Sequence, residues 1–565
     1  FGQQRPHQGK TVFVDPLDNA EGYAVYYQHD AFSRLEEKAD QVFGRSLKKA
    51  LRQTHVSGNE RKQYTIAISA ASAYTRYHGG TKALATAAIA TMLNRVNEVY
   101  ERDVGVEFQL AEGNDSVIFT DQENDPFLNT SQDMNLNVQV QNKARNEHEL
   151  GAFDIGHVVN TNGGGVAILG SLCTGNRSRG MTGSRNPVGD AFFIDYVAHE
   201  IGHQMGADHT FNGTSRSCGK RNRNPDHAYE PGSGSSIMAY AGICGVQNLQ
   251  PHTDPYFHST SIDQMRAHMA SVPDCGTTIP LTDNPPPQAM AGDDYTIPAN
   301  TPFVLKGDGK SSDNAPLTYT WEELDLGAAS DTVEDMVDDG SRPLFRFVPP
   351  TSSPERILPS LPSLLSNTLA MGEAWPTTNR NLNFRLTVRN GQGGVASDNM
   401  RVRVVDTGLA FKVTGPKAAM LTAGSKQNIT WDVADTDLPP IACQKVDLFL
   451  TQNEGKAWSS LGSGLPNRGT ATVTLPDNLA NKIRFKVACS DNIFFALSGP
   501  YQSRTKLVGP LVSSNSIDAK SAPDTNGSSL TNVKTDASTD NSGGGGSFGF
   551  WGLALGLLAW QRRKA

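Results

Sequence analysis

The segment from His199 to His209, with the sequence HEIGHQMGADH, most strongly constrains how this chain can fold. On a helix, His199 and His203 are one turn apart, so both imidazoles lie on one face and can bind one zinc ion at about 2.0 to 2.1 Å. Gly206 can adopt the left-handed conformation that ends a helix, which brings His209 back as a third ligand. Three protein ligands leave one coordination position open, as in a catalytic rather than a structural zinc site.

A carboxylate, Glu200, lies beside this predicted metal site. Zinc lowers the pKa of a bound water to about 7 and polarises a carbonyl group, while a neighbouring carboxylate takes the proton of the water and passes it to the leaving amine. Glu200 suits this role of general base. The alternative is a buried helix with incidental histidines, but the spacing of Gly206 and His209 favours metal-assisted hydrolysis. An apolar stripe at helical spacing supports the helix itself, formed by Ile194, Ala198, Ile201 and Met205.

The same eleven residues are similar to the metzincin signature HExxHxxGxxH, and the segment from Ser236 to Tyr240 (SIMAY) resembles the metzincin Met-turn around Met238. The resemblance implies a cleft between two subdomains, with the Met-turn beneath the zinc. Residues 164–173 (GGVAILGSLC) look like the edge strand and following cysteine of the adamalysin (reprolysin) branch. Thr210 stands where adamalysins usually carry Asp, and Tyr240 is more like astacins and serralysins. The chain therefore resembles a bacterial reprolysin-like branch.

Two further roles concern the substrate. In the families that carry the tyrosine it lies near the metal and can donate to the developing oxyanion, so Tyr240 is a candidate transition-state donor. The alternative is a tyrosine packed below the site. An edge strand with unpaired backbone groups can bind an extended peptide by strand addition, and the alternative is an ordinary edge strand. The resemblance favours substrate binding by Val166, Ala167, Ile168 and Leu169.

The chain is long enough for several domains, with 565 residues of which 37% are hydrophobic. A buried strand from Tyr64 and an amphipathic helix after it open the expected catalytic domain, residues 63–279. Strands alternating with helices predict an α/β (α+β) domain with a twisted mixed sheet. The further strands are expected at 104–110, 117–120, 155–159 and 166–169. A long surface loop is expected from Asn212 to Gly234, because this segment is rich in Asn, Gly, Arg and Pro.

Two all-β Ig-like sandwiches are expected to follow, over residues 288–406 and 409–508, because short strands recur at sandwich-like intervals. The segment Thr318–Trp321 followed by Leu386–Val388 resembles a PKD-type module, and residues 349–376 form an atypical insertion. Neither sandwich contains a catalytic constellation. They could hold substrate or cell wall, or act as spacers.

Charge and cysteine content indicate which partners and which redox compartment suit the protein. A net charge of −8 and the absence of any basic block longer than Arg562–Lys564 argue against nucleic acid as a partner. Six cysteines, none in a CxxC pair, indicate disulfides in an oxidising compartment. The adamalysin resemblance implies the pairs Cys173–Cys275 and Cys218–Cys244. The remaining pair is Cys443–Cys489, since no other cysteine lies in the second sandwich.

Two segments of the N-terminal half leave alternatives open. Residues 1–62 resemble the tail of a prosegment, and the alternative is an N-terminal extension packed on the enzyme. They contain no cysteine, so a cysteine-switch mechanism of latency has no support in them. Asp115, Asp121 and Asp125 are a candidate calcium cluster, but their spacing matches no dedicated calcium loop and a solvated acidic loop is the alternative.

The C-terminal segment has two parts. Residues 510–546 are rich in Ser, Asn, Asp and Thr and are expected to be a flexible linker. Residues 547–565 contain an apolar run from Phe548 to Trp560 that would reach about 20 Å as a helix, short of the roughly 30 Å hydrocarbon core. With the glycines before it and the arginines after it, this run is similar to Gly-Gly C-terminal sorting signals. That resemblance implies transient membrane contact and cleavage by a rhomboid-type sorting protease, and the alternative is a tail anchor.

Together these features predict a multidomain, extracellular zinc metalloendopeptidase, secreted by or attached to the surface of a Gram-negative bacterium. It would use one catalytic zinc ion and act on protein or peptide substrates. The alternative from another class is a surface adhesin with a degenerate protease domain. The presence of all four site residues, three histidines and one glutamate, argues against that alternative.

Overall fold

The computed structural model describes residues 56–504, apart from 163, 220 and 419, and the backbone of four short strands nearer the N-terminus. Contacts divide the chain into one unit of residues 1–506 and another of residues 507–565. The predicted linker and sorting segment lie outside the described residues, as do most of residues 1–55. Within the described part, no helix is both long enough and apolar enough to cross a membrane.

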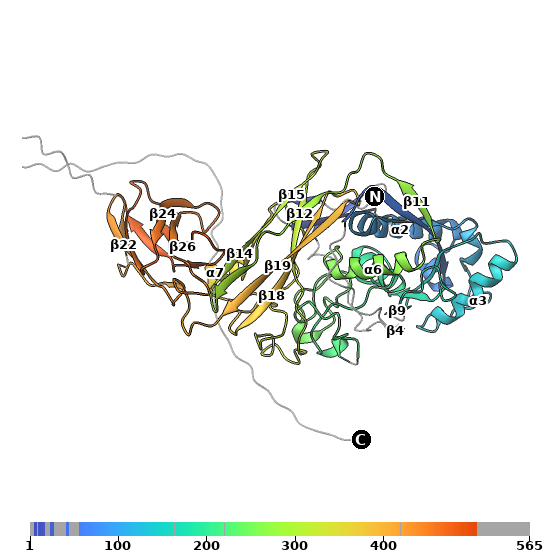
Figure 1. The fold of residues 1–565 in the computed structure, drawn as a ribbon. Helices are drawn as coiled ribbons and strands as arrows, with labels where there is room; N and C mark the ends of the chain where they lie inside the picture. The colour runs from blue at the N-terminus through green and yellow to red at the C-terminus, as the bar shows by residue number, and fades with distance from the viewer. Residues whose placement is uncertain are drawn as a thin grey trace, which may run out of the picture. The chain divides into compact units, whose positions relative to one another are not determined.

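A mixed sheet organises the catalytic part of the chain (Figure 1). Its central pairs β6–β7, β6–β8 and β8–β10 are parallel, as is the pair β4–β9 at one edge, whereas the pairs β9–β10 and β11–β6 are antiparallel. The predicted mixed sheet is therefore confirmed. Its strand order is β11 (Thr277–Pro280), β6 (Glu60–Ala70), β8 (Ile155–Asn160), β10 (Gly180–Gly183), β9 (Gly164–Ile168) and β4 (Gln41–Phe43), with β7 (Val106–Leu110) paired to β6.

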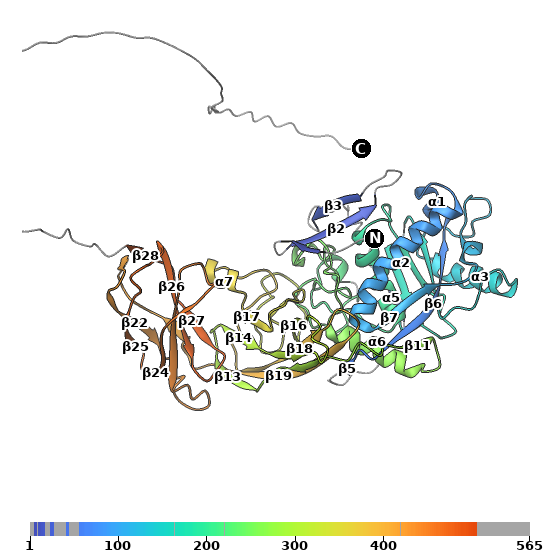
Figure 2. The same ribbon diagram turned by 90° about the horizontal axis from the view of Figure 1, so that it is seen from above.

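The long helix α2 (Lys82–Val104) packs along β7 and against the helical segment that carries the metal site (Figure 2). Thr81 caps its first turn, and Gly105 ends it with a φ of 72°. The buried face of α2 includes Tyr100, whose hydroxyl donates to the carbonyl of Ala198 at 2.7 Å. The remaining helices of this part are α1 (Ser72–Tyr77), α3 (Asp133–Asn146) and α6 (Ser259–Ser271).

The prediction of a strand at residues 117–120 is wrong. Residues Asn114–Val117 form a 3-10 turn, and Ile118 makes only a single bridge to Ala70. The side chain of Asn114 takes the place of a neighbouring strand, because it accepts from Ile68 N at 2.8 Å and donates to Ile68 O at 2.9 Å. One amide side chain therefore satisfies the backbone groups that a strand would have paired.

The first sandwich is built on a five-stranded sheet that borrows a strand from the start of the catalytic part. Its members are β13 (Tyr295–Pro298), β19 (Val395–Val405), β18 (Arg380–Arg389), β16 (Thr318–Glu323) and the borrowed β5 (Val56–Ser57). Two strand pairs complete the module, β14 (Phe303–Lys306) with β17 (Glu355–Leu358) and β12 (Gln288–Met290) with β15 (Asp308–Lys310). The insertion at 349–376 supplies β17 and the short helix α7 (Leu361–Ser366).

The second sandwich has a larger and a smaller sheet. The larger contains β21 (Met420–Thr422), β28 (Tyr501–Arg504), β26 (Lys482–Cys489), β23 (Lys445–Thr451), β24 (Ser459–Pro466) and β27 (Phe495–Leu497), and the smaller contains β20 (Lys412–Val413), β22 (Lys426–Asp432) and β25 (Thr470–Thr474). One continuous apolar core runs through both sandwiches. At their junction the rings of Phe411 and Phe494 lie 5.1 Å apart, and Phe494 pairs with Phe303 of the first module. The two sandwiches therefore share their interior.

The first sandwich is joined to the catalytic part by buried charges. Arg389 on β18 donates to Asp103 at the end of α2 at 3.0 Å, and both side chains are fully buried. Arg385, also on β18, donates to Asp263 on α6 at 2.6 Å. Buried charges require partners, so these pairs fix the module against the back of α2 and α6.

Candidate active site

The HEIGH segment lies on a helix assembled from three pieces. A short turn α4 (Asp190–Phe192) leads into a π-helical stretch η3 (Phe193–Ala198) and then into α5 (His199–Gln204). The four residues of the predicted apolar stripe are all buried in the core. Gly206 ends the helix with a φ of 101°, a backbone conformation that favours glycine. The chain then turns back so that His209 reaches the other two histidines.

The three predicted histidine ligands come together. The Nε2 atoms of His199 and His203 are 3.0 Å apart, and those of His203 and His209 are 3.1 Å apart. Ligands held at about 2.0 to 2.1 Å in a tetrahedral shell would be separated by roughly 3.3 Å. All three side chains are buried, and among the described residues they form a group able to hold a metal ion.

The opposite ring nitrogens decide which atoms face the metal. Nδ1 of His199 lies 2.7 Å from Ile237 O, and Nδ1 of His203 lies 2.7 Å from Ala207 O. For His209 the partner is Asn222 O at 2.6 Å. Carbonyl oxygens only accept hydrogen bonds, so each Nδ1 carries the proton and each neutral ring presents a lone pair at Nε2.

Three lone pairs that converge in this way repel one another unless a cation lies between them. Protonation of one ring would relieve the repulsion between only one pair of rings, whereas a divalent ion accepts all three lone pairs. Three neutral imidazoles are a ligand set that suits zinc. The residues present therefore suit the predicted ion.

Glu200 is fully buried and faces the strand β9. A Cβ atom built on Gly165 of β9 would lie 1.6 Å from Glu200 Oε1, so the carboxylate lies directly over the glycine backbone. A side chain at position 165 would displace the carboxylate. Gly165 is thus a site residue that the sequence analysis placed in the strand motif without giving it a role. The signal for it was the glycine pair at the start of an otherwise apolar strand.

The Met-turn lies against α5. A Cβ atom on Gly202 would be 2.5 Å from Met238 Sδ, and Met238 O accepts from Thr210 N at 3.2 Å. Tyr240 is 4% exposed, with its ring 4.6 Å from that of His209 and stacked on Phe211 at 4.5 Å. The Tyr240 hydroxyl is buried and has no hydrogen-bond partner among the described residues.

A buried glutamate missed by the sequence analysis links the third ligand to the Met-turn. Glu230 accepts from the Thr210 hydroxyl at 2.6 Å and from the Ser236 hydroxyl, while its other oxygen accepts from the backbone N–H groups of Ser235 at 2.8 Å and Ser236 at 3.1 Å. Thr210, the departure from the adamalysin pattern, is thus one of four donors to this carboxylate. No motif marks Glu230, because its partners are distant in sequence.

The expected substrate strand β9 is present, but its outer side is not a free edge. Residues Gln41–Phe43 (β4) pair with it in parallel, Gln41 opposite Val166, Val42 opposite Ala167 and Phe43 opposite Ile168. The strand ends at Ile168, one residue before the predicted Leu169. The prediction of unpaired backbone groups is therefore wrong for this chain, because an N-terminal segment occupies them.

The prediction that the loop from Asn212 to Gly234 lies on the surface is also wrong in part. Residues 227–234 are buried, as are Asn212 and Ser217. The composition is polar because these side chains bond to backbone groups. The loop is covered by residues of the first sandwich, as when Asn212 donates to Ala328 O at 3.0 Å.

The candidate calcium cluster is not supported. Asp125 instead accepts from Ser72 N at 2.6 Å and Phe127 N at 2.9 Å, and Asp121 accepts from Asn124 N at 2.9 Å. None of these aspartates, nor Asp115, belongs to a group able to hold a metal among the described residues. Asp121 and Asp125 each accept from a nearby backbone N–H in a local turn, and Asp125 also accepts from the first residue of α1.

The six cysteines form three disulfides in the structure. The pairs are Cys173–Cys275, Cys218–Cys244 and Cys443–Cys489, the same three that were expected. The first ties the end of the substrate strand region to the segment after α6, and the second closes the loop beside the Met-turn.

Comparison with known proteins finds a family similar to the part of the chain that contains the site. Residues 60–267 match the model described as Metallo-peptidase family M12B Reprolysin-like. No curated protein matches the chain. Among solved structures, it is similar to SGBP-B of the Bacteroides ovatus mixed-linkage glucan utilization locus in complex with a heptasaccharide, at 10% identity over 39% of this chain and 48% of that chain with a TM-score of 0.13. It is also similar to the chicken CNTN1 FN1-FN3 domains, at 9% identity over 39% and 68% with a TM-score of 0.17.

The chain spans about half the length of the first of these structures, and TM-scores this low carry no argument about either fold or function. The family match has different weight, because its 60–267 range contains the three histidines, Glu200 and the Met-turn. The histidine geometry and the family match agree. Residues 60–267 are therefore similar to reprolysin-like metallopeptidases, and they contain the three-histidine group able to hold a metal ion.

Proposed function

We propose that the protein is a zinc metalloendopeptidase that hydrolyses peptide bonds in proteins or peptides. The observation that carries the proposal is the convergence of three Nε2 lone pairs beside a buried carboxylate. His199, His203 and His209 would hold the ion. When bound, zinc supplies a polarised carbonyl and an acidified water.

The protein's own residues then divide the remaining work. Glu200 takes a proton from the attacking water and delivers it to the leaving amine. Its buried position next to the histidines favours this role. Tyr240 donates a hydrogen bond from its hydroxyl to the developing oxyanion, a role supported by the buried hydroxyl having no other partner among the described residues. The backbone of β9, at Val166, Ala167 and Ile168 and continuing to Leu169, would align an extended substrate by strand addition once β4 no longer pairs with it.

The proposed setting is extracellular, secreted or attached to the surface of a Gram-negative bacterium. Three disulfides support an oxidising compartment. Cleavage by a sorting protease before Phe548 would remove the C-terminal segment after transient membrane contact, and intact-mass measurement on protein from the native host tests this. A full-length C-terminus would favour a tail anchor.

The test of the proposed reaction is the substitution Glu200→Gln. It removes the base and leaves the three imidazoles, so peptide hydrolysis should fall by about 10² to 10⁴-fold while one zinc ion per chain stays bound. His203→Ala should lose the metal instead. Metal analysis and a peptide-library digest of the purified chain provide both readouts. Near-normal turnover in Glu200→Gln would rule out this base, and an inactive wild-type chain that holds zinc would favour the adhesin alternative.

A further inference from the structure

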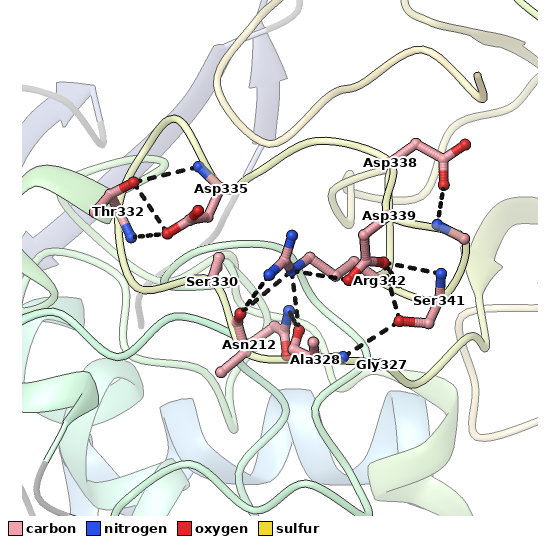
Figure 3. Close-up of polar contacts among 12 residues, drawn as sticks. Asn212, Gly327, Ala328, Ser330, Thr332, Asp335, Asp338, Asp339, Ser341 and Arg342 are labelled. Carbon is pink, nitrogen blue, oxygen red and sulfur yellow. Dashed lines mark hydrogen bonds and ion pairs between the residues drawn. The ribbon is translucent and has the colours of Figure 1, made fainter. Parts of the chain in front are cut away.

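A loop of the first sandwich lies against the segment that follows the third histidine. This β16–β17 loop, residues 324–354, connects two strands of the module (Figure 3). Ser330 pairs with Gly213 as an isolated bridge, Asn212 donates to Ala328 O at 3.0 Å, and Thr214 Oγ1 donates to Asp331 at 2.6 Å. The contact therefore joins backbone as well as side chains across more than a hundred residues of sequence.

A second anchor holds the same stretch from the other side. Gln247, fully buried beside the Met-turn loop, donates to Ser330 O at 2.8 Å and accepts from Thr214 N at 2.9 Å. One side chain thus bonds to both partners of the contact. The β16–β17 loop and the segment 212–214 are held as one piece.

Arg223 extends this piece to the metal centre. Its guanidinium donates to Asn212 Oδ1 at 2.8 and 3.0 Å and to Gly327 O at 2.8 Å. The peptide bond before Arg223 carries the Asn222 carbonyl, which accepts from His209 Nδ1 at 2.6 Å. A peptide group is planar, so anchoring Arg223 restricts the orientation of the Asn222 carbonyl. That carbonyl sets the tautomer and direction of the third ligand.

The loop is braced internally so that Gly327 O stays in place. Arg342 donates to Ala328 O at 3.3 Å and to Ala329 O at 3.1 Å (Figure 3). Asp338 accepts from Arg380 on β18 at 2.8 Å, which ties the loop to the main sheet of the sandwich. A Cβ atom on Gly327 would lie 2.4 Å from the backbone carbon of Ser341, so the first part of the loop lies directly against its middle. The bracing lies wholly within the sandwich module.

From these contacts we propose that the first sandwich is a working part of the metal centre. Its β16–β17 loop, acting through Arg223, positions the Asn222 carbonyl and thereby His209. Arg223 is a positioning residue, not a catalytic one. The inference rests on the proposed zinc site and adds that the site is incomplete without the loop. A sandwich that acts only as a spacer would leave zinc affinity unchanged when the loop is loosened.

The experiment measures the zinc dissociation constant of the full chain by competition with a chromophoric chelator. Arg223→Ala is expected to raise this constant by about tenfold or more, within the 10 to 100-fold range typical of residues that support metal ligands. Arg342→Ala, which removes only bracing inside the module, is expected to raise it in the same direction. Arg221→Ala is the matched control, because Arg221 is an exposed arginine two positions away in the same loop.

Thermal unfolding of the metal-free variants separates positioning from loss of fold. If Arg223→Ala does not fold, Arg223→Lys keeps the charge but not the forked geometry that reaches Asn212 and Gly327 together, and it replaces the alanine variant. Wild-type zinc affinity in the folded Arg223 and Arg342 variants overturns the inference. Zinc binding by the wild type without peptide hydrolysis would instead overturn the proposed function and leave the affinity comparison valid.

Discussion

Gly165 on β9 and Glu200 on the metal-site helix lie directly against each other. The carboxylate occupies the volume that any side chain at position 165 would need. Strand and base are therefore positioned by each other. A substrate aligned on β9 would lie next to the proton acceptor without any movement of the helix.

Gly165→Ala is expected to lower kcat by about tenfold or more, part of the 10² to 10⁴ that a general base contributes. The added methyl group pushes the Glu200 carboxylate away from its position, while the three histidines keep their partners. Steady-state kinetics with a peptide substrate, together with metal analysis, checks this. Gly175→Ala is the control, since a Cβ atom there has nothing within 4 Å. Equal kcat in the two variants would contradict the assigned contact.

At this scale the sequence predicted the residues that carry the chemistry but not those that hold them. His199, Glu200 and His203 follow from local spacing on one helix, and His209 follows from the turn at Gly206 directly after it. Glu230 and Arg223 could not be found in this way. Their partners come from distant segments, and only the folded chain brings them together.

Among the elements, β4 has the most direct bearing on activity. It pairs with β9 at the three positions where an extended peptide would bind. Removal of residues 1–55 is therefore expected to raise kcat/KM for a peptide substrate, mainly through a lower KM, because a competing strand is gone. A shorter deletion of residues 1–27 keeps β4 and should not have this effect. Equal kinetics in both truncated chains would show that β4 does not compete with substrate.

The strand β8 contributes a pH dependence of stability. Burial lowers the pKa of His157 to about 4, although Gln204 on α5 hydrogen bonds to its ring at 2.9 Å. In the unfolded chain this histidine takes up a proton near pH 6.5, whereas the folded protein resists protonation until about pH 4. The stabilisation is complete above pH 6.5 and is lost as the pH falls toward 4, by as much as about 3 kcal/mol.

Denaturant unfolding of the wild type and of His157→Asn across this pH range checks the expectation. The variant lacks the titrating group, so its free energy of unfolding should fall less steeply between pH 6.5 and pH 4. Parallel pH profiles for the two proteins would assign the acid sensitivity to other groups.

Element boundaries show where sequence patterns stop being informative. Short strands in both sandwiches and the amphipathic helix α2 were predicted because alternation and helical periodicity are local. The strand expected at 117–120 failed because Asn114 satisfies the backbone of β6 with its side chain. The prediction that β9 has a free edge was wrong for a related reason, since its partner β4 comes from a segment far away in sequence.

The two parts of the molecule, the first sandwich and the catalytic part, are joined by the buried pair of Arg389 and Asp103. Burial alone would raise the pKa of Asp103, but Arg102 and Arg389 lower it below its ordinary value. Arg389→Met leaves the carboxylate with less compensation inside the protein. The free energy of unfolding should fall by about 3 to 5 kcal/mol, as measured by denaturant titration.

Arg401→Met is the matched control for this substitution. Arg401 pairs with Asp294 at 2.8 Å, but both side chains are more than half exposed. An exposed pair contributes little, about 0 to 1 kcal/mol. A loss for Arg389→Met as small as that for Arg401→Met would mean that the interface between the two parts does not depend on this pair.

The brace that runs from Asp338 and Arg342 through Gly327 to Arg223 limits how this protein could be recombined. A sandwich of the same fold but with another β16–β17 loop would present no carbonyl at the position of Gly327 O. Exchanging the sandwich at Pro285–Pro287, the three prolines just before its first strand, would therefore transfer the fold of the module and lose the support of His209. A functional chimera therefore has to take the β16–β17 loop and residues 212–223 from the same parent protein. The part that must be exchanged as a whole includes residues of both the catalytic domain and the first sandwich.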